Sequence, residues 1–358
     1  MSEVPSFTGH RILFEGERWF GSNCGSSFRA LLRMGNSVLD VDPSSYIPLG
    51  WSGFFLKAAR RVMMPMLVKQ YNGSILKLAR GFKPEIFLAF KGQFILPETL
   101  QEMRAMGISL YNFYPDTWVY ASNTPWLPRT LQEYDCVFST KKFTASDMEK
   151  RGTPLRDFFY LAHGYDPELH CPTPVSVVES SIYGSDVTFI GAYSPGKMEI
   201  LSKLESLSPG LNLTIWGNDW EKAKAPNLQQ YIKGRWLPGV EYVKGLCSSK
   251  IAIALLLERS YGASSGDRIT SRTFNIPATG TFMIHQRTDE VMEYFEEGKE
   301  IECFGTPEEL AEKIKFYLAH PEERKAIAQA GYRRCVPAYS QDSRMKVILD
   351  WHRSHSGR

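Results

Sequence analysis

The sequence predicts an α/β protein made of two Rossmann-like, doubly wound domains that face a central cleft. Short apolar runs alternate with helical patterns along the chain, which is typical of parallel sheets covered by helices. This alternation occurs twice, on either side of a proline-rich stretch over 166–181. The length of 358 residues also exceeds the size of one ordinary core, so two cores are expected.

The stretch over 166–181 shows no helical periodicity and is interpreted as an interdomain linker. We therefore expect an N-terminal domain over 1–172 and a C-terminal domain over 173–335. A last helix within 336–358 is expected to pack back on the N-terminal domain.

The composition excludes several classes of protein. The formal net charge of +3, from 42 basic and 39 acidic residues, is too small to indicate a nucleic-acid partner. The six cysteines are scattered without metal-ligand spacing, which favours free thiols and no metal site. The N-terminus lacks the pattern of a signal peptide, and no apolar run approaches the ~20 residues of a membrane span. We expect a cytoplasmic protein, or one peripheral at the inner face of the membrane.

The first βαβ unit is predicted as a strand over 11–14, a Gly/Ser-rich turn, a helix over 28–35 and a strand over 37–42. The turn follows the first strand, at the edge where open α/β sheets bind ligands. Gly21 and Ser22 of this turn are therefore predicted to contact a ligand. Because the turn lacks a G-x-G-x-x-G fingerprint, a strand-to-helix turn without a ligand is the alternative.

Residues 51–84 contain seven basic residues and no acidic one, interleaved with large apolar side chains. Such a pattern can form a basic amphipathic surface for an anionic lipid headgroup or an acidic acceptor. A solvated helix face is the more frequent reason for a run of charge and stays open as the alternative. Pro65 is expected to interrupt this helix.

Four further strands of this domain are predicted over 85–92, 108–116, 135–140 and 158–164. Three polar side chains follow the apolar cores of these strands: Lys91, Asp116 and His163. Because the carboxyl ends of parallel strands meet at one edge, all three are candidate functional groups. Each also has a structural alternative. The lysine can extend its charged end from the strand to water, the aspartate can cap the next helix, and the histidine can form hydrogen bonds within the linker.

The second domain is predicted to contain strands over 186–191, 212–217, 250–258, 281–285 and 300–305. The backbone N–H groups of Gly191 to Gly196, at the start of a helix and beside Lys197, form a predicted anion site. The stretch from 264 to the glycine at 280 is interpreted as one helix that feeds a strand. Arg268 and Arg272 would then share one helical face and clamp the same anion, for which a diphosphate fits best.

The C-terminal helices are interpreted as structural. Thr306, Pro307 and Glu309 have the spacing of an N-cap, a first-turn proline and a capping box. The next helix is predicted to end at Gly331 as its C′ residue, and the last one spans 340–353.

Several segments resemble the spore-maturation CgeB-like glycosyltransferases of the GT-B class. They are FIGAYSPGKMEILSKL, LTIWGNDW and SRTFNIPATGTFMIH in the second half, and KPEIFLAFKG, YDCVFSTKKF and LAHGYDPELHCP in the first. The resemblance covers residues 84–335. It implies a GT-B pair of Rossmann-like domains, with a nucleotide-diphosphate sugar on the C-terminal one and the acceptor on the other. Gly21, Ser22 and Lys91 would then lie on the acceptor side.

The same resemblance implies roles on the donor side. Gly191, Lys197 and Arg272 would hold the diphosphate with Arg268, and the base would be bordered by Trp216, Gly217 and Asn218. The Glu-x7-Glu register of many retaining GT-B enzymes falls on Asp267 and Asn275, with Gly280 in place. Both acids are altered, and Asn275 keeps hydrogen-bonding capacity without charge.

The sequence therefore predicts a glycosyltransferase that moves a sugar from a nucleotide-diphosphate donor to an unidentified acceptor, such as a glycan or lipid-linked sugar in polysaccharide biosynthesis. An inverting reaction would use Asp116 or His163 as base, whereas a retaining one would depend on Asp267 and the diphosphate. Two arginines, Lys197 and a helix N-terminus can neutralise the leaving group, so no metal and no other cofactor is expected.

Two alternatives stay open. The altered positions Asp267 and Asn275 are also compatible with a catalytically degenerate GT-B module that only binds a glycan or a nucleotide. A nucleotide-sugar epimerase of the same fold would differ by needing no acceptor.

Overall fold

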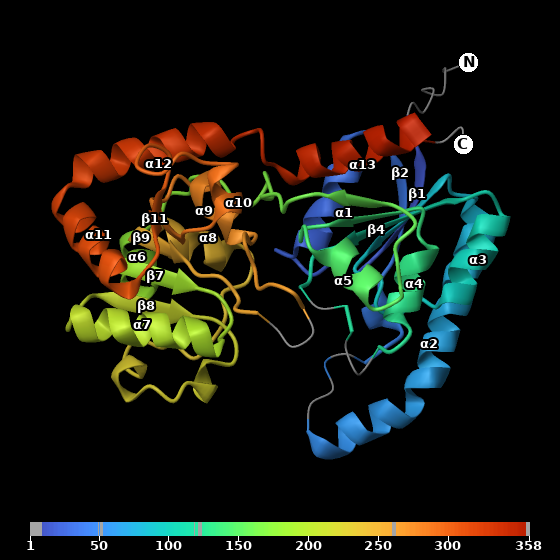
Figure 1. Cartoon of the computed structure of the whole chain (residues 1–358), viewed down its shortest axis with the longest axis horizontal. Coiled ribbons are helices and arrows are strands. Elements are labelled where there is room, and N and C mark those ends of the chain that lie inside the picture. The colour runs from blue at the N-terminus through green and yellow to red at the C-terminus, as the bar shows by residue number, and fades with distance from the viewer. Residues whose placement is uncertain are drawn as a thin grey trace. The chain divides into compact units, whose positions relative to one another are not determined.

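The computed structural model describes residues 9–48, 50, 53–117, 119–120, 124–259 and 263–355. These residues form two compact units (Figure 1). The first unit contains 9–162, the short piece 263–264 and the C-terminal segment 344–355, and the second contains the remainder. Each unit has a parallel sheet and a core of its own.

The sheet of the first unit has six described strands in the order β2-β1-β3-β4-β5-β6, and every pairing is parallel. The strands are β1 (Arg11–Glu15), β2 (Ser37–Val41), β3 (Ile86–Phe90), β4 (Ser109–Tyr114), β5 (Cys136–Ser139) and β6 (Phe158–Tyr160). Strand β1 lies between β2 and β3, so the chain reverses its direction of travel across the sheet there. Such a switch point leaves a crevice at the carboxyl ends of the two strands.

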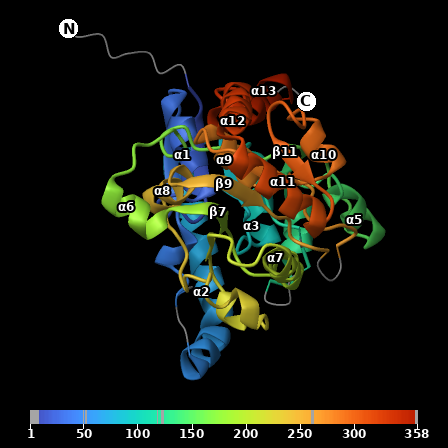
Figure 2. The ribbon, with the colours of Figure 1, turned by 90° about the vertical axis from the view of Figure 1, so that its left-hand side faces the viewer.

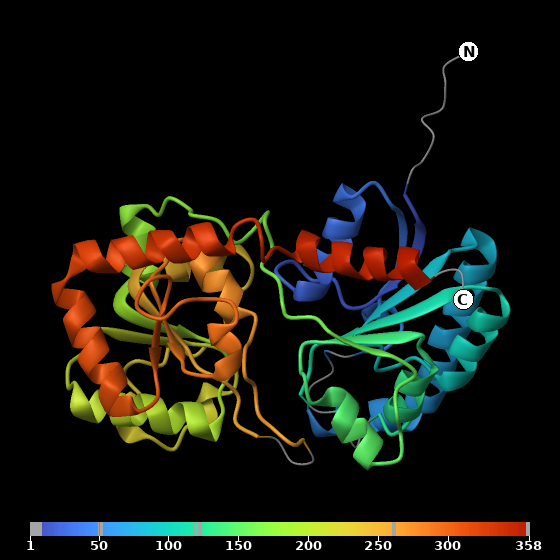
Figure 3. The same ribbon diagram turned by 45° about the horizontal axis from the view of Figure 1, so that its top comes forward.

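Helices cover both faces of this sheet (Figure 3). They are α1 (Asn23–Arg33), α2 (Phe54–Phe82), α3 (Pro97–Ala105), α4 (Leu127–Glu133), α5 (Thr144–Lys150) and α13 (Gln341–His355), with a 3₁₀ turn at Pro43–Ser45. Ile12 and Phe14 of β1 pack toward α1 and the Met345 to Leu349 part of α13. Leu13, which points to the other face, packs with α2 and α3. Burial on both faces explains the continuous apolar runs of the strands.

Helix α2 runs unbroken through Pro65 for 29 residues, so the predicted interruption is wrong. Pro65 is exposed, and the carbonyl of Arg61 that loses its bond lies on an exposed turn where water can satisfy it. The second half of the helix is held by a buried apolar stripe at helical spacing, made of Val68, Tyr71, Ile75 and Ala79. None of the described helices combines the length and hydrophobicity that a transmembrane segment requires.

The sheet of the second unit has five described strands in the order β11-β10-β9-β7-β8, again all parallel. They are β7 (Ser185–Ile190), β8 (Leu213–Trp216), β9 (Ser249–Ala254), β10 (Met283–Gln286) and β11 (Glu302–Phe304). Strand β7 lies between β8 and β9, which makes a second switch point. The predicted fold class, two Rossmann-like doubly wound domains, is thereby confirmed.

The helices of this unit are α6 (Val177–Tyr183), α7 (Pro195–Leu207), α8 (Val240–Cys247), α9 (Arg272–Ala278), α10 (Asp289–Met292), α11 (Pro307–Ala319) and α12 (Pro321–Cys335). Short 3₁₀ turns lie at Trp220–Lys222 and Pro226–Leu228. Helices α7 and α11 lie side by side over the core of β7, β8 and β9 (Figure 1). Helices α6 and α8 lie together on another side of the unit (Figure 2).

Three predicted boundaries are wrong. Helix α1 begins at Asn23 rather than at 28, because the Ser22 Oγ accepts from the Gly25 N–H and caps it earlier. The end of the predicted linker over 166–181 is helical, since Ser176 and Glu179 form a capping box that starts α6. Helix α12 continues through Gly331, where a Cβ atom would lie 2.2 Å from the Glu300 carbonyl oxygen. That glycine permits close packing and does not end the helix.

Thr306 caps α11 as predicted, but Glu309 does not complete a capping box. Its carboxylate accepts from the Gly305 N–H at 2.7 Å and pairs with Arg287 at 2.5 Å. Bonding to Arg287 is the main reason why the pKa of Glu309 falls to about 2. The acid therefore serves a network that joins α11 to the loops after β10 and β11.

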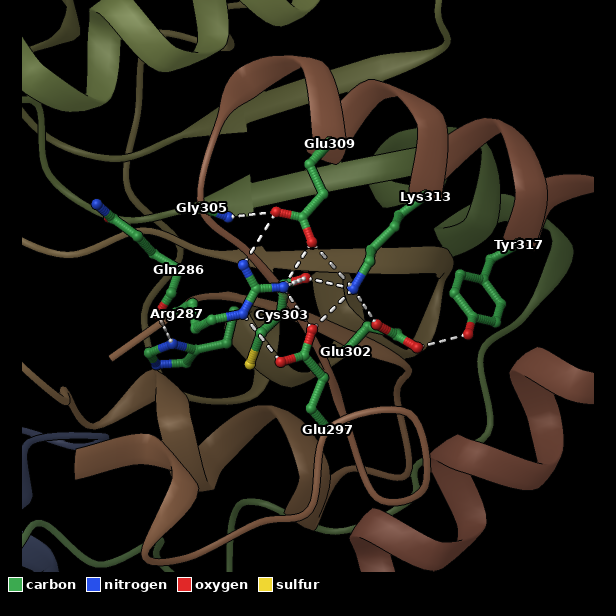
Figure 4. Close-up of polar contacts among 10 residues, drawn as sticks. Gln286, Arg287, Glu297, Glu302, Cys303, Gly305, Glu309, Lys313 and Tyr317 are labelled. Carbon is green, nitrogen blue, oxygen red and sulfur yellow. Dashed lines mark hydrogen bonds and ion pairs between the residues drawn. The ribbon is translucent and has the colours of Figure 1, made fainter. Parts of the chain in front are cut away.

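This ion network contains two cations and three carboxylates (Figure 4). Lys313 of α11 contacts Glu297 at 2.9 Å and Glu302 at 2.5 Å, and it also donates to the Cys303 carbonyl. Glu302 is buried and accepts a second bond from the Tyr317 hydroxyl at 2.6 Å. Lys313 is thus the cation that compensates a buried carboxylate on the edge strand β11.

We expect the substitution Lys313→Ala to lower the free energy of unfolding by about 3 kcal/mol, because it leaves Glu302 buried without its cation. Lys203→Ala is the matched control, since Lys203 reaches Glu308 only at 3.8 Å and both side chains are exposed. We expect less than about 0.5 kcal/mol from the control. Urea denaturation of the full chain measures both, and equal losses in the two variants would contradict the assignment.

Candidate functional site

The second unit holds a half-buried cation, Arg272, at its switch point. Arg272, the first residue of α9, donates from Nη2 to the Leu255 carbonyl at 2.7 Å, just beyond β9. Its guanidinium carbon lies 5.6 Å from the ring centroid of Phe189 on β7. The Nε atom is buried and has no hydrogen-bond partner among the described residues. Burial lowers the pKa of Arg272, yet a guanidinium stays protonated, so a desolvated charge is held here.

Gly191 and Lys197 complete the surroundings of Arg272. A Cβ atom on Gly191 would lie 2.9 Å from the Arg272 Nη1 atom, so only glycine leaves room for the guanidinium. Lys197, buried in the first turn of α7, donates to the Ala192 carbonyl at 3.1 Å. Burial, and next the charge of Arg272, lower the pKa of Lys197 to about 8. Two predicted diphosphate ligands therefore lie together at the carboxyl edge of this sheet.

The predicted cradle of backbone N–H groups over 191–196 is wrong in detail. The N–H of Gly191 donates to the Trp216 carbonyl at 2.8 Å, and that of Tyr193 donates to the Asn218 carbonyl at 2.9 Å. The start of α7 is already occupied by the carboxylate of Glu258, which accepts from the Ser194 hydroxyl at 2.6 Å. The protein's own acid therefore takes the place at the helix N-terminus that we assigned to a phosphate.

Arg268 does not share a helical face with Arg272, so the predicted arginine clamp is wrong. Helix α9 begins only at Arg272, and the preceding chain folds back on the segment that follows β9. The Asp267 N–H donates to the Leu257 carbonyl at 2.8 Å, and a Cβ atom on Gly266 would lie 2.5 Å from the same oxygen. Arg268 instead points to Asp289, at 3.3 Å, on the surface.

Of the positions in the Glu-x7-Glu register, two lie near Arg272 and one does not. Burial lowers the pKa of both Arg272 and Lys197, and the charge of Asp267 partly opposes this lowering, which places the carboxylate near them. Asn275 is buried next to Tyr242, and its Oδ1 atom has no hydrogen-bond partner among the described residues. Gly280 precedes β10 at the amino edge of the sheet, in a left-handed turn with φ of +73°.

Strand β8 ends at Trp216, beside the carboxyl end of β7, and is followed by Gly217 and Asn218. Trp216 is buried, and the guanidinium of Arg235 lies 5.4 Å from its ring centroid. Gly217 has φ of +148°, and a Cβ atom there would lie 2.0 Å from the Gly191 carbonyl oxygen. This close approach of two glycines sets the separation of the two strand ends.

In the first unit a cavity of about 230 Å³ lies over the crevice between β1 and β3. It brings together three predicted residues, Ser22, Lys91 and Asp116. Lys91, held in a left-handed conformation with φ of +76°, pairs with Asp116 at 2.7 Å. Gly21 adopts φ of +90° directly before Ser22 and does not line the cavity itself.

His163, the other predicted base, belongs to the second unit, where it is buried beyond β6. It does not line the cavity that contains Asp116. The two predicted bases are therefore not brought together within one unit.

The sequence analysis missed Glu15, the last residue of β1, which also lines this cavity. Glu15 is fully buried and accepts a hydrogen bond at 2.8 Å from the hydroxyl of Tyr71 on α2. Burial is the main cause that raises the pKa of Glu15 to about 8, against the lowering effect of the Tyr71 bond. An acid that closes an apolar strand, followed by glycine, was the signal in the sequence.

A second cavity, of about 1180 Å³, lies between α2 and the loop after β3. Its lining is mainly apolar, from Met64, Val68, Leu76, Leu96 and Trp126, and it also contains three basic residues (Arg60, Arg61 and Lys69) and two acidic ones (Glu98 and Glu102). Gln93 and Phe94 line both cavities, so the two adjoin.

One further set of side chains has the chemistry of metal ligands. His10, Glu85 and His352 hold their ligating atoms within 4.8 Å of one another. Glu85 pairs with His10 at 2.9 Å, and the Tyr111 hydroxyl lies 3.1 Å from His352. His10 and Glu85 directly precede β1 and β3, so this set lies at the amino edge of the sheet, opposite the cavity.

Comparison with known proteins relates the second half of the chain to glycosyl transferase-like sequences. Residues 197–350 match the family model described as glycosyl transferase-like. The spore protein CgeB of Bacillus subtilis (strain 168) is 25% identical over 216 residues, which make up 53% of this chain and 64% of CgeB. The chain thus matches less than two thirds of that relative. The chain is therefore similar to glycosyl transferase-like proteins over 197–350 and to CgeB over 216 residues.

Solved structures confirm the GT-B fold along almost the whole chain. Sucrose-phosphate synthase from Thermosynechococcus elongatus is similar with a TM-score of 0.67 and 12% identity, over 96% of this chain and 98% of the other. Anabaena HepE in complex with UDP-glucose is similar with a TM-score of 0.63 and 12% identity, over 96% and 100%. The expected GT-B fold is therefore confirmed, and the similarity to CgeB agrees with the expected family.

We expect Gly217→Ala to lower the free energy of unfolding by more than about 2 kcal/mol, because the new methyl group collides with the Gly191 carbonyl. Gly210→Ala is the control, since Gly210 also has positive φ, +78°, but no atom within 4 Å of an added Cβ. It should cost only about 1 kcal/mol of backbone strain. Thermal unfolding compares the two, and equal losses would show that the close approach is unimportant.

Proposed function

We propose that the chain transfers a glycosyl group from a nucleoside diphosphate sugar to an acceptor hydroxyl, with the donor bound by the second unit and the acceptor by the first. The observation that carries the proposal is Arg272, a half-buried side chain whose buried Nε atom has no hydrogen-bond partner among the described residues, next to Lys197 at the carboxyl edge of a parallel sheet. Ligands of open α/β sheets bind at such switch points. Two desolvated cations there suit a diphosphate rather than a neutral ligand.

The chemistry of the leaving group supports the same assignment. When the bond between the sugar and the diphosphate breaks, negative charge develops on the diphosphate, and preorganised cations stabilise it most where water is excluded. The similarity to HepE, whose structure holds UDP-glucose, adds support for a nucleotide-sugar donor. Because protein cations can supply this charge, we propose a reaction without a metal ion, in which chelation by EDTA leaves the rate unchanged.

The alternative is a GT-B module that binds the nucleotide without turning it over. It is favoured by Asn275, because many retaining enzymes carry an acid at this position and asparagine has no charge. The buried Oδ1 atom of Asn275 can still accept a hydrogen bond from a ribose hydroxyl. An epimerase remains a third, lower-ranked alternative, distinguished by conversion of the donor without any acceptor.

The acceptor side favours an acceptor that carries an apolar chain. Helix α2 exposes Phe55, Leu56, Val62 and Met66 among basic residues, and in Figure 1 its N-terminal part extends beyond the sheet of the first unit. The large cavity beside α2 is mainly apolar, with Arg60, Arg61 and Lys69 on the wall that α2 forms and Glu98 and Glu102 on the wall that α3 forms. We propose a lipid-linked acceptor and a peripheral position at the inner face of an anionic membrane.

We expect a nucleoside diphosphate to raise the melting temperature of the full chain in a panel of UDP, GDP and ADP. Lys197→Met should weaken binding by about 10- to 100-fold, because it removes a buried charged contact. Lys203→Met on the same helix is the control, since Lys203 is exposed and should leave binding unchanged. A chain that binds none of the three nucleotides would contradict the proposed function.

The pH dependence of this binding gives a second readout of Lys197. Its pKa of about 8 means that the amine is protonated below that pH and neutral above it. Affinity should therefore fall as the pH rises through 8. Lys197→Arg keeps the charge and should remove the fall. Binding without turnover of any nucleotide sugar would favour the non-catalytic module.

We expect the full chain to bind vesicles of phosphatidylglycerol and phosphatidylcholine, and to bind pure phosphatidylcholine weakly. The double variant Phe55→Ser and Val62→Ser should lose most of this binding in flotation, because both side chains are exposed, at 85% and 81%. Val177→Ser with Val178→Ser is the matched control on α6, at 87% and 68% exposure. Equal flotation of both variants and the parent chain would exclude α2 as the contact.

A further inference from the structure

We propose that Glu15 is the catalytic base of the transfer, receiving the proton of the acceptor hydroxyl in the cavity between the carboxyl ends of β1 and β3. The inference rests on the proposed function and goes beyond it by naming the group and the stereochemical course. It replaces Asp116 and His163, the two bases that strand position alone suggests.

The geometry of Glu15 is that of a prepared proton acceptor. It is the last residue of β1, it lines the cavity, and it is 1% exposed. Its Oε1 atom accepts from the Tyr71 hydroxyl at 2.8 Å, which fixes the carboxyl group. Its Oε2 atom is buried and has no hydrogen-bond partner among the described residues. A buried oxygen of this kind is costly unless a ligand satisfies it.

The cavity has the lining that a sugar or another polyhydroxyl ligand requires. Aromatic side chains of Trp19, Phe90 and Phe94 lie beside the polar groups of Ser22 and Gln93. Aromatic faces pack against the apolar faces of a sugar ring, and the polar groups bond to its hydroxyls. Since Phe94 and Gln93 also line the apolar cavity, a hydroxyl at Glu15 can belong to an acceptor whose chain lies beside α2.

The electrostatic surroundings make Glu15 a stronger base than a free carboxylate. Burial acts first to raise the pKa of Glu15, and the nearby charges of Glu17 and Asp42 add to it, against the lowering effects of the Tyr71 bond and of the nearby Gly92 N–H. The other titratable groups around it are Cys24, Tyr134 and, through Glu17, Lys91. Burial raises the pKa of Tyr71 as well, so that hydroxyl keeps its proton and remains a donor. A base whose pKa lies near the working pH is the most effective kind.

Asp116 lacks these properties. It is half-exposed and forms an ion pair at 2.7 Å with Lys91, which occupies one of its oxygens. The pair suits a role in orienting acceptor hydroxyls at the mouth of the cavity.

The step balances as a single displacement. The acceptor oxygen forms a bond to the anomeric carbon while the bond from that carbon to the diphosphate oxygen breaks. The hydroxyl proton moves to Glu15 Oε2, and the electron pair leaves with the nucleoside diphosphate. Because the acceptor oxygen attacks the face opposite the departing diphosphate, the configuration at the anomeric carbon inverts.

The test measures nucleoside diphosphate release from UDP-glucose, UDP-N-acetylglucosamine and GDP-mannose, with water as the acceptor. Glu15→Gln should lower the rate by about 10²- to 10³-fold, because the amide cannot take up a proton. It should keep the nucleotide-induced rise in melting temperature. Glu149→Gln, on the exposed surface of α5, is the control and should change neither.

The pH profile separates catalysis from a structural role. The rate of the parent chain should rise with pH and level off above about 8, as Glu15 loses its proton. Tyr71→Phe removes a bond that stabilises the carboxylate, so the plateau should move to higher pH. A group that only supports the fold would leave this midpoint in place.

The outcomes distinguish the inference from the proposed function. Unchanged release by Glu15→Gln would overturn the role of Glu15 and leave the transferase intact. Nucleotide binding without release from any donor would overturn the role of Glu15 and favour the binding module. Absence of nucleotide binding by the parent chain would overturn both.

Discussion

Parallel strand pairing with helices on both faces is the constraint on which the rest of this structure depends. Each sheet buries its two faces, so polar side chains are tolerated mainly where strands end. At the carboxyl edge the strand order decides where such groups can converge. In both units the chain reverses its direction beside the first strand, between β1 and β3 and between β7 and β9. Glu15 and Arg272 lie at these two points.

Both residues are ionisable groups removed from water, but their burial has opposite chemical consequences. Burial favours the neutral form of Glu15 and so raises its affinity for a proton, whereas Arg272 cannot give up its charge under ordinary conditions. The first is therefore suited to accept a proton and the second to hold an anion. The network around Lys313 shows the structural use of buried charge, because there each carboxylate already has a cation. Glu15 and Arg272 differ from this network because each has a buried atom, Oε2 and Nε respectively, without a hydrogen-bond partner among the described residues.

The sequence predicts the strands well because a strand buried on both faces leaves a continuous apolar run, and it places Ser22, Lys91 and Asp116 after strand ends, where one cavity collects them. It does not reveal Glu15 or Tyr71 as a pair, because they lie 56 residues apart and meet only through packing of α2 on β1. Local patterns mislead where tertiary contacts prevail. Pro65 does not break α2, Gly331 does not end α12, and the stretch before Arg272 is not helical, because packing against neighbouring segments decides each conformation.

If the catalytic base is Glu15 of the first unit, the replacement of the two expected glutamates by Asp267 and Asn275 in the second unit does not imply a loss of activity. A retaining reaction depends on groups beside the donor, and Asn275 offers no charge there. A single displacement needs from the second unit only cations for the leaving group, and this is the role that we propose for Arg272 and Lys197. In the proposed reaction the proton of the acceptor hydroxyl is taken up by the first unit, where Glu15 is buried, hydrogen-bonded to Tyr71 and part of the cavity lining. Asn275 is on this view compatible with an active inverting transferase rather than a sign of lost activity.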